Sequence, residues 1–237
     1  KTAYDMINNS AQFNKLSLSN GLLMRILPIG ILGAVNFDYG NNDILRMVEQ
    51  EAELTHPNSI VISATFIYCM CIKYVLKGLS KTVIQNKIMN LARKLNTPRV
   101  VILLSDSKHH PEPCYLIDDH HNEIYVMTDD KKYQGYIGVA LQNALYEFFN
   151  GNDYDNSILN IIKRGGDVDT NCAIAGGLLG AFYGINNINK KWINTIKTTK
   201  VERYIKYPFL SPNSIDKCLD KLVRISKSVD RLAKIEK

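Results

Sequence analysis

Residues 164–184 of this 237-residue chain read RGGDVDTNCAIAGGLLGAFYG, and they constrain the fold more strongly than any other stretch. Two glycines open the stretch, and such a pair lets the backbone turn tightly and lets a ligand come close. The small and apolar residues that follow predict a helix, because Ala173, Gly177 and Ala181 recur every four positions and share one side. We therefore expect a tight turn leading into a helix that packs closely against neighbouring backbone.

The turn carries two carboxylates and a hydroxyl, on Asp167, Asp169 and Thr170. One interpretation is a helix N-cap, for which Asp169 or Thr170 is suited, with a carboxylate favourably placed near the helix N-terminus. The other is a metal site, because Mg²⁺ prefers hard oxygen ligands and keeps several waters beside one or two carboxylates. A cap needs only one of the three residues, and both interpretations stay open.

The order of these residues resembles a known family. Gly-Gly-Asp-x-Asp-Thr, followed by Ala-Ile-Ala-Gly and Gly-Ala-x-Tyr-Gly, is similar to the C-terminal metal motif of the ADP-ribosylglycohydrolases of the dinitrogenase-reductase-activating glycohydrolase type. In that family the motif coordinates a pair of magnesium ions. The resemblance implies that Asp167, Asp169 and Thr170 are metal ligands in this chain and that the cofactor is Mg²⁺.

A second signature begins at Ser19-Asn20-Gly21, which is a turn signal followed by apolar residues typical of a helix that Pro28 would kink. Taken alone, the segment is either a turn into a buried helix or a helix start whose amides hold a phosphate. The pattern Ser-Asn-Gly-x-x-Met-Arg-x-x-Pro resembles the element that lines the ADP-ribose site in the same family. The resemblance thus assigns Ser19, Asn20 and Gly21 to substrate binding.

A lone histidine before a proline, such as His56, most often lies in a loop or caps a helix. Here the histidine belongs to Leu54-Thr55-His56, which resembles the Leu-Thr-His of the family. The family histidine lies near the bound ADP-ribose, so the resemblance implies that His56 also lines the substrate pocket.

The family's N-terminal Thr-Asp-Asp-Thr metal motif has no counterpart ahead of Ser19. Thr128-Asp129-Asp130 resembles part of it but follows the Leu-Thr-His element, so we interpret it as a charged turn and not as metal ligands. Half of the ligands implied by the resemblance are then missing, so where the family holds two ions we expect this chain to hold one or none. Three explanations stay open: a fragment of a longer enzyme, an ADP-ribose-binding module without catalysis, or replacement of the missing ligands by residues 128–130 or a partner chain. No catalytic residue is assigned.

Helical spacing of apolar residues recurs along most of the chain. It predicts helices over residues 42–54, 59–79, 80–96, 135–150, 153–163 and 214–236, with shorter ones before residue 18 and around Trp192. Residues 100–104 are either a strand or a buried helical turn. No linker or fixed-period repeat divides the sequence. We predict an all-α fold, a single compact orthogonal helical bundle over residues 1–237, and the family resemblance implies the same.

Composition narrows the class of protein. Hydrophobic residues make up 46% and charged residues 22% of the chain, as is usual for a soluble globular protein. The formal net charge of +6 is spread along the sequence, so no specific nucleic-acid site is indicated. Five cysteines without a disulfide pattern favour a reducing, cytoplasmic compartment. We find no apolar run of transmembrane length and expect no membrane partner.

A group of metal-binding residue types lies between residues 109 and 121. It contains His109, His110, Cys114, His120 and His121. Neighbouring histidines usually point apart, and the spacing matches no common zinc motif. A polar loop is therefore favoured over a zinc site.

The resemblance implies a magnesium-dependent hydrolase that releases ADP-ribose from modified protein side chains. Its partners would be ADP-ribosylated protein or free ADP-ribose. The alternative is a catalytically impaired ADP-ribose-binding module, or a fragment that lacks the first metal motif.

Overall fold

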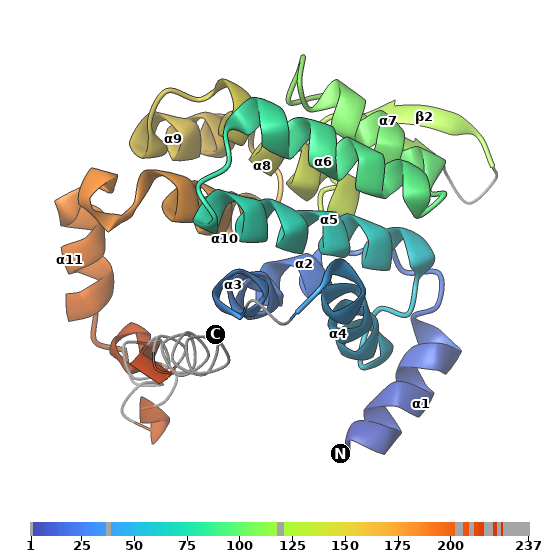
Figure 1. Cartoon of the computed structure of the whole chain (residues 1–237), viewed down its shortest axis with the longest axis horizontal. Coiled ribbons are helices and arrows are strands. Elements are labelled where there is room, and N and C mark those ends of the chain that lie inside the picture. Colours follow the sequence, from blue (N-terminus) through green and yellow to red (C-terminus); the bar gives the residue numbers. More distant parts are fainter. Residues whose placement is uncertain are drawn as a thin grey trace, which may run out of the picture.

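The computed structural model of the chain describes residues 2–36, 39–117, 121–201, 206–208, 211–215, 220–221 and 224. Helices joined by short loops dominate this part of the chain, with one small β-hairpin (Figure 1). The α-helices are α1 (Ala3–Phe13), α2 (Gly21–Arg25), α3 (Leu27–Val35), α4 (Asn41–Glu53), α5 (Ser59–Leu76), α6 (Lys81–Lys94), α7 (Pro98–Asp106), α8 (Ile137–Asn150), α9 (Tyr154–Arg164), α10 (Val168–Tyr183) and α11 (Lys190–Thr198). The all-α prediction is confirmed.

The remaining elements are short. Strands β1 (Cys114–Ile117) and β2 (Glu123–Val126) pair antiparallel, with Cys114 opposite Val126 and Ile117 opposite Glu123. The 3-10 turns are η1 (Ile185–Asn187) and η3 (Pro212–Ser214). The hairpin was not predicted, and residues 100–104 lie in α7, so the helical alternative for that segment is confirmed. Most of the predicted C-terminal helix over residues 214–236 lies outside the described residues.

Helix α5 is the centre of the bundle. In Figure 1 it crosses the middle of the molecule, with α3 and α4 below it and α6 above it, and it contacts α2, α3, α4, α6, α7, α8 and α10. Its sequence is apolar on nearly all sides, which is typical of a buried helix. The Asn58 side chain caps its start by accepting a hydrogen bond from the Ile60 amide at 2.9 Å.

The same helix corrects one expectation from the sequence. Ser59–Leu76 has 18 residues and a mean hydropathy of 1.8, so it is long and apolar enough to cross a membrane. However, 72% of this window is buried inside the protein. Burial among other helices explains the apolar composition, because the core of a globular protein demands the same residues.

Pro28 divides the second signature as predicted. Helix α2 ends at Arg25 and α3 begins at Leu27. Two glycines then let α3 lie against its neighbours. A Cβ atom added to Gly30 would stand 2.9 Å from Ile72 Cβ on α5, and one added to Gly33 would stand 2.4 Å from Ile44 Cδ1 on α4.

Helix α10 approaches α5 closely through its small residues, as the four-residue spacing predicts. A Cβ atom added to Gly177 would stand 2.8 Å from the Tyr68 hydroxyl of α5. That buried hydroxyl donates a hydrogen bond of 2.8 Å to the Ile174 carbonyl of α10. Burial raises the pKa of Tyr68 well above its ordinary value, so the phenol stays protonated and keeps its hydrogen to donate.

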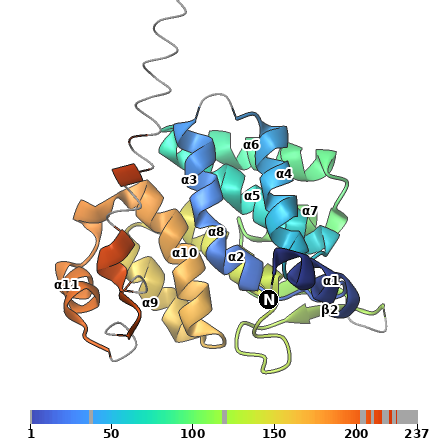
Figure 2. The ribbon, with the colours of Figure 1, turned by 90° about the horizontal axis from the view of Figure 1, so that it is seen from below.

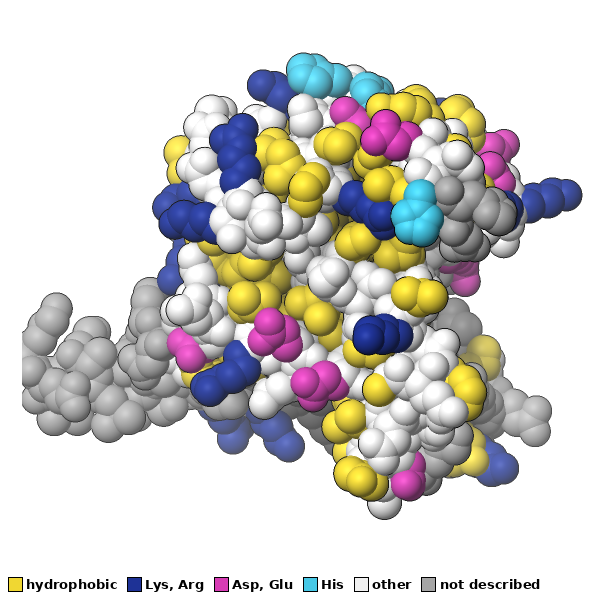
Figure 3. Space-filling model, turned by 90° about the vertical axis from the view of Figure 1, so that its right-hand side faces the viewer, with side chains coloured by type: hydrophobic (Ala, Val, Ile, Leu, Met, Phe, Trp, Pro, Cys, Tyr) yellow, Lys and Arg dark blue, Asp and Glu magenta, His cyan; other side chains and the backbone are white. Residues whose placement is uncertain are grey.

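The face shown in Figure 3 carries hydrophobic, basic and acidic side chains in an interspersed arrangement. Among the coloured side chains of that face, no broad area has a single charge sign. This agrees with the even distribution of basic residues along the sequence.

Tyr68→Phe tests the contact between α5 and α10. The ring would still fill its place, but the hydroxyl donor to Ile174 would be lost, so the free energy of unfolding should fall by about 1 kcal/mol. Urea denaturation followed by circular dichroism measures this change. An unchanged unfolding midpoint would show that the hydrogen bond does not contribute.

Candidate substrate and metal site

The glycine turn lies between α9 and α10. Helix α9 ends at Arg164, and Gly165 and Gly166 follow with φ angles of 77° and 73°, in the left-handed region that favours glycine. The tight turn is confirmed. The N-cap of α10 is Asp167, whose side chain makes no capping hydrogen bond, so the expectation that Asp169 or Thr170 caps the helix is wrong.

The Asp167 carboxylate is instead bound by Asn20 of the Ser19-Asn20-Gly21 turn. Asn20 Nδ2 donates a hydrogen bond of 2.8 Å to Asp167 Oδ2, between residues that are 147 positions apart. Asn20 is only 5% exposed, so this bond is shielded from water at its donor end. Figure 2 shows α2 beside α10, where this contact is made. The structure thus brings both family signatures to one place.

The Ser19-Asn20-Gly21 turn is held by the segment before α8. The Asn20 amide donates to the Gly135 carbonyl at 3.0 Å, and Ser19 forms an isolated antiparallel bridge with Tyr136. The Gly21 amide lies 3.4 Å from Ser19 Oγ. Because its amide already has a backbone acceptor, Asn20 cannot offer it to a phosphate, so an anion at this turn would have to use other donors.

His56 adjoins the same turn. A Cβ atom added to Gly21 would stand 3.2 Å from His56 Cε1 and 3.4 Å from His56 Nε2. The other ring nitrogen, Nδ1, lies 2.8 Å from Thr55 Oγ1. Burial, and then the nearby Arg25 guanidinium, lower the pKa of His56 below its ordinary value. The imidazole is therefore neutral near pH 7.

Arg25 fastens α2 to the end of α4. Its Nη2 donates to the Glu51 carbonyl at 2.8 Å, and its Nε lies 3.5 Å from Glu51 Oε2. Its Nη1 also lies 3.5 Å from the Gly21 carbonyl. Arg25 therefore links the helix that begins at the Ser-Asn-Gly turn to the helix that precedes His56.

Asp169 and Thr170 lie in the first turn of α10, where Asp169 is exposed. With Asp167 they form a set of hard oxygen donors, which fits a hydrated Mg²⁺. Asn171 follows, fully buried, and neither polar atom of its side chain has a hydrogen-bond partner.

Beyond this set of oxygen donors, the part of the chain that the structure describes holds no cluster of metal-binding side chains. Among the described residues, no group of three or more His, Cys, Asp and Glu is arranged to hold a metal ion. This includes the described members of the 109–121 region, where Cys114 is buried in β1. Residues 118–120, with His120, lie outside the description.

The sequence did not reveal that Thr128 adjoins the glycine turn. Residues 128 and 129 form a turn, as predicted, but a Cβ atom added to Gly166 would stand 2.0 Å from the Thr128 carbonyl oxygen. One added to Gly165 would stand 3.4 Å from Asp129 Cβ. The signal in the sequence was the glycine pair itself, because a residue without a side chain is required where another backbone comes so close.

Comparison with known proteins identifies the family. The chain matches the ADP-ribosylglycohydrolase family over residues 2–223. It belongs to the ADP-ribosylglycohydrolase family. The resemblance drawn from the three signatures is therefore confirmed.

Individual relatives agree with this assignment. This ADP-ribosylglycohydrolase homologue is 29% identical over 214 residues to L543 of Acanthamoeba polyphaga mimivirus, which its name assigns provisionally to the ADP-ribosyl glycohydrolases. The match covers 88% of this chain but only 63% of that relative. A shorter match, 35% identical over 71 residues, is to the ADP-ribosyl-[dinitrogen reductase] glycohydrolase of Rhodospirillum rubrum and covers 30% of this chain and 24% of the relative.

One further relative and one solved structure are also similar to the chain. The ADP-ribosylarginine hydrolase Tri1 of Serratia proteamaculans (strain 568) is 31% identical over 68 residues, or 29% of this chain and 19% of the relative. A solved structure described as an ADP-ribosylglycohydrolase-related protein complex has the same fold, with a TM-score of 0.60 at 22% identity over 82% of this chain. The chain spans 62% of that structure.

Alanine at either glycine tests the turn of this family member. Gly165→Ala should lower the free energy of unfolding by about 1–3 kcal/mol, because alanine is strained at a positive φ. Gly166→Ala should lower it further, since the same strain is joined by a clash with the Thr128 carbonyl. Thermal and urea unfolding of the two variants measure the difference, and equal losses would contradict the close approach of Thr128.

The pKa of His56 provides a second test. Arg25→Met removes the smaller of the two causes, so the pKa should rise part of the way toward 6.5 while burial keeps it depressed. A proton NMR titration of the His56 ring measures this rise, with Arg46→Met, an exposed arginine of α4, as the control. A similar rise in both variants would exclude a specific effect of Arg25.

The lowered pKa of His56 also makes the free energy of unfolding depend on pH. A histidine whose folded pKa lies below its unfolded value takes up a proton more readily in the unfolded chain. Its contribution to stability should therefore fall as the pH drops below about 6.5, the unfolded value. His56→Gln should make the stability less sensitive to pH in that range.

Proposed function

We propose that the chain is a magnesium-dependent hydrolase that releases ADP-ribose from modified protein side chains. The observation that carries the proposal is the hydrogen bond from Asn20 to Asp167, because it joins the expected substrate-binding turn to the expected metal ligands. Family membership supports the general activity. The metal ion, the substrate and the activity of this chain are the parts that are proposed.

In this proposal Asp167, Asp169 and Thr170 hold Mg²⁺. When bound, the cation supplies a Lewis acid that orients and polarises the oxygens of the substrate ribose. Asn20 donates a hydrogen bond to Oδ2 of Asp167, so in this proposal Oδ1 is the oxygen that would ligate the cation. In the reaction water adds across the glycosidic bond, so the ribose carbon gains a hydroxyl and the side chain regains a proton. The carboxylates favour the positive charge that develops on the sugar.

In this proposal the nucleoside end of the substrate would lie beside Ser19. A pocket of about 320 Å³ is lined by Leu16, Leu18, Ser19, Leu116, Ile117, Lys132, Tyr133, Gly135 and Tyr136. Aliphatic and aromatic walls with few polar groups suit the faces of a purine ring. Because Ser19 borders both the pocket and the Asn20 turn, a substrate could extend from the pocket toward Asp167.

His56 would act near the middle of the substrate. Its pKa is lowered by burial, so the ring is neutral and can accept or donate one hydrogen bond without bringing a charge. Nδ1 is occupied by Thr55, and Nε2 lies on the side of Gly21. This orientation makes His56 a residue that positions the ribose or the pyrophosphate and not one that neutralises it.

The proposed partner is an ADP-ribosylated protein. The names of two relatives specify ADP-ribosyl-dinitrogen reductase, a modified protein, and ADP-ribosylarginine, a modified amino acid. The cysteines Cys69, Cys71, Cys114 and Cys172 are unpaired, which fits the proposed reducing, cytoplasmic location.

An ADP-ribose-binding module without turnover is the second candidate. It is favoured by the small number of carboxylates at the turn among the described residues. A binding module would keep the Asn20 turn, His56 and the pocket but would not cleave the glycosidic bond.

Release of ADP-ribose from an ADP-ribosylated protein mixture tests the proposal. The chain is incubated with Mg²⁺ or with a chelator, and free ADP-ribose is measured by mass spectrometry. We expect release with Mg²⁺, little release with chelator, and a loss of at least about 100-fold in the Asp167→Ala and Asp169→Ala double variant, as is typical when metal ligands or their supports are removed.

The matched control is Glu49→Ala with Glu53→Ala, which removes two exposed carboxylates from α4. It should retain full release. Calorimetric titration with ADP-ribose separates the two candidates: binding without release identifies the module, and neither binding nor release refutes both functions.

A further inference from the structure

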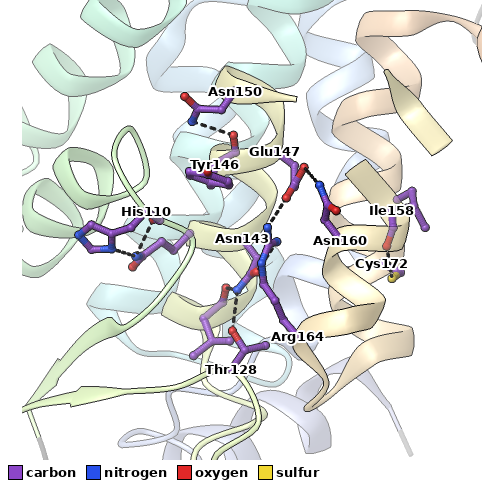
Figure 4. Close-up of polar contacts among 12 residues, drawn as sticks. His110, Thr128, Asn143, Tyr146, Glu147, Asn150, Ile158, Asn160, Arg164 and Cys172 are labelled. Carbon is purple, nitrogen blue, oxygen red and sulfur yellow. Dashed lines mark hydrogen bonds and ion pairs between the residues drawn. The ribbon is translucent and has the colours of Figure 1, made fainter. Parts of the chain in front are cut away.

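Helix α8 carries a buried polar stripe that the proposed function does not yet use. Asn143 and Glu147 lie one helical turn apart, and they are 0% and 1% exposed. The side chains of both residues interact with the guanidinium of Arg164, the last residue of α9 before the glycine turn. Nη1 of Arg164 donates to Asn143 Oδ1 at 3.0 Å, and Nη2 forms an ion pair with Glu147 Oε1 (Figure 4).

The same stripe reaches Thr128 on the other side. Asn143 Nδ2 donates to Thr128 Oγ1 at 3.2 Å, as drawn in Figure 4, and also to the Val139 carbonyl at 2.9 Å. The amide of Thr128 donates to Glu112 Oε2 at 2.9 Å. Thr128 is completely buried, so its backbone and its side chain are both fixed.

These contacts close a ring around the glycine turn. From Thr128 the ring passes through the Asn143 side chain to Arg164, then along the backbone to Gly166, where the absence of a side chain leaves room for the Thr128 carbonyl. Asp167 is the next residue. The backbone that presents its carboxylate is therefore clamped from both sides before Asn20 adds its own hydrogen bond.

Stability alone is a poor explanation for this arrangement. A buried ion pair loses much of its attraction to the desolvation of both charges, and apolar side chains of similar volume often stabilise a protein equally well. A metal site, by contrast, requires its ligands within about 0.5 Å of the right position, which hydrogen-bonded neighbours can enforce.

We propose that Thr128, Asn143 and Arg164 are positioning residues that set the Asp167 carboxylate for cation binding. This role rests on the proposed metal site and adds to it the residues that hold the turn in place. None of the three touches the cation. They act through the backbone of residues 164–167.

The test is a titration with Mn²⁺, a paramagnetic substitute for Mg²⁺, in which electron paramagnetic resonance measures free Mn²⁺. Thr128→Val removes the hydroxyl but keeps the shape, whereas Thr128→Ser keeps the hydroxyl. We expect Thr128→Val to weaken Mn²⁺ binding about tenfold and Thr128→Ser to restore most of the affinity.

Thr97→Val is the matched control for stability. Thr97 Oγ1 lies 2.9 Å from Ser63 Oγ and joins α7 to α5, so this change also removes a threonine hydroxyl from a tertiary contact. Thr97→Val should lower the melting temperature by about as much as Thr128→Val does, and it should leave the Mn²⁺ affinity unchanged. Equal effects of Thr97→Val and Thr128→Val on Mn²⁺ affinity would overturn the positioning role.

Arg164→Lys gives an independent arm in case Thr128→Val does not fold. Lysine keeps a positive charge for Glu147 but lacks the planar fork that also reaches Asn143. The expected result is a folded protein with Mn²⁺ affinity reduced about tenfold. Wild-type affinity in a folded Arg164→Lys variant would contradict the proposal.

The wild-type chain separates this inference from the proposed metal site. If it binds Mn²⁺ and the Asp167→Ala variant does not, the metal site is supported and the Thr128 and Arg164 variants decide the positioning role. If the wild-type chain binds no Mn²⁺, the metal site and the positioning role are both refuted.

Discussion

The close approach of α10 to its surroundings is the constraint on which the rest of the structure depends. Just before its start, Gly166 leaves room for the Thr128 carbonyl, and near its middle Gly177 leaves room for the Tyr68 hydroxyl of α5. Larger side chains at these positions would move α10 away from both neighbours. The carboxylate of Asp167 could then no longer accept the hydrogen bond of Asn20.

This constraint explains why a site can form from distant parts of the chain. Asn20, His56 and Asp167 come from the start of α2, the loop between α4 and α5, and the start of α10. Helix α5 contacts α2, α4 and α10. It therefore acts as the common support, and its apolar sequence serves the site by holding three polar segments at fixed distances.

Local patterns in the sequence predicted the features that depend on local chemistry. The apolar helix α5, the break near Pro28 and the left-handed glycines follow from residue types and spacing alone. Contacts between distant segments could not be predicted in this way. Thr128 follows the Leu-Thr-His element and so departs from the family's order, and only the tertiary fold shows that its carbonyl lies against Gly166.

The spacing of apolar residues does not predict the role of the buried polar residues of α8. Asn143 and Glu147 share the face that, by spacing, belongs to the core, and burying them unpaired would be costly. Arg164 and Thr128 remove that cost, yet apolar residues would avoid it altogether. Apolar packing does not fix the orientation of a backbone segment, because dispersion contacts are non-directional. A hydrogen bond, by contrast, fixes both a distance and an angle. A turn that must present one carboxylate in one orientation therefore has a physical reason to be held by buried hydrogen bonds.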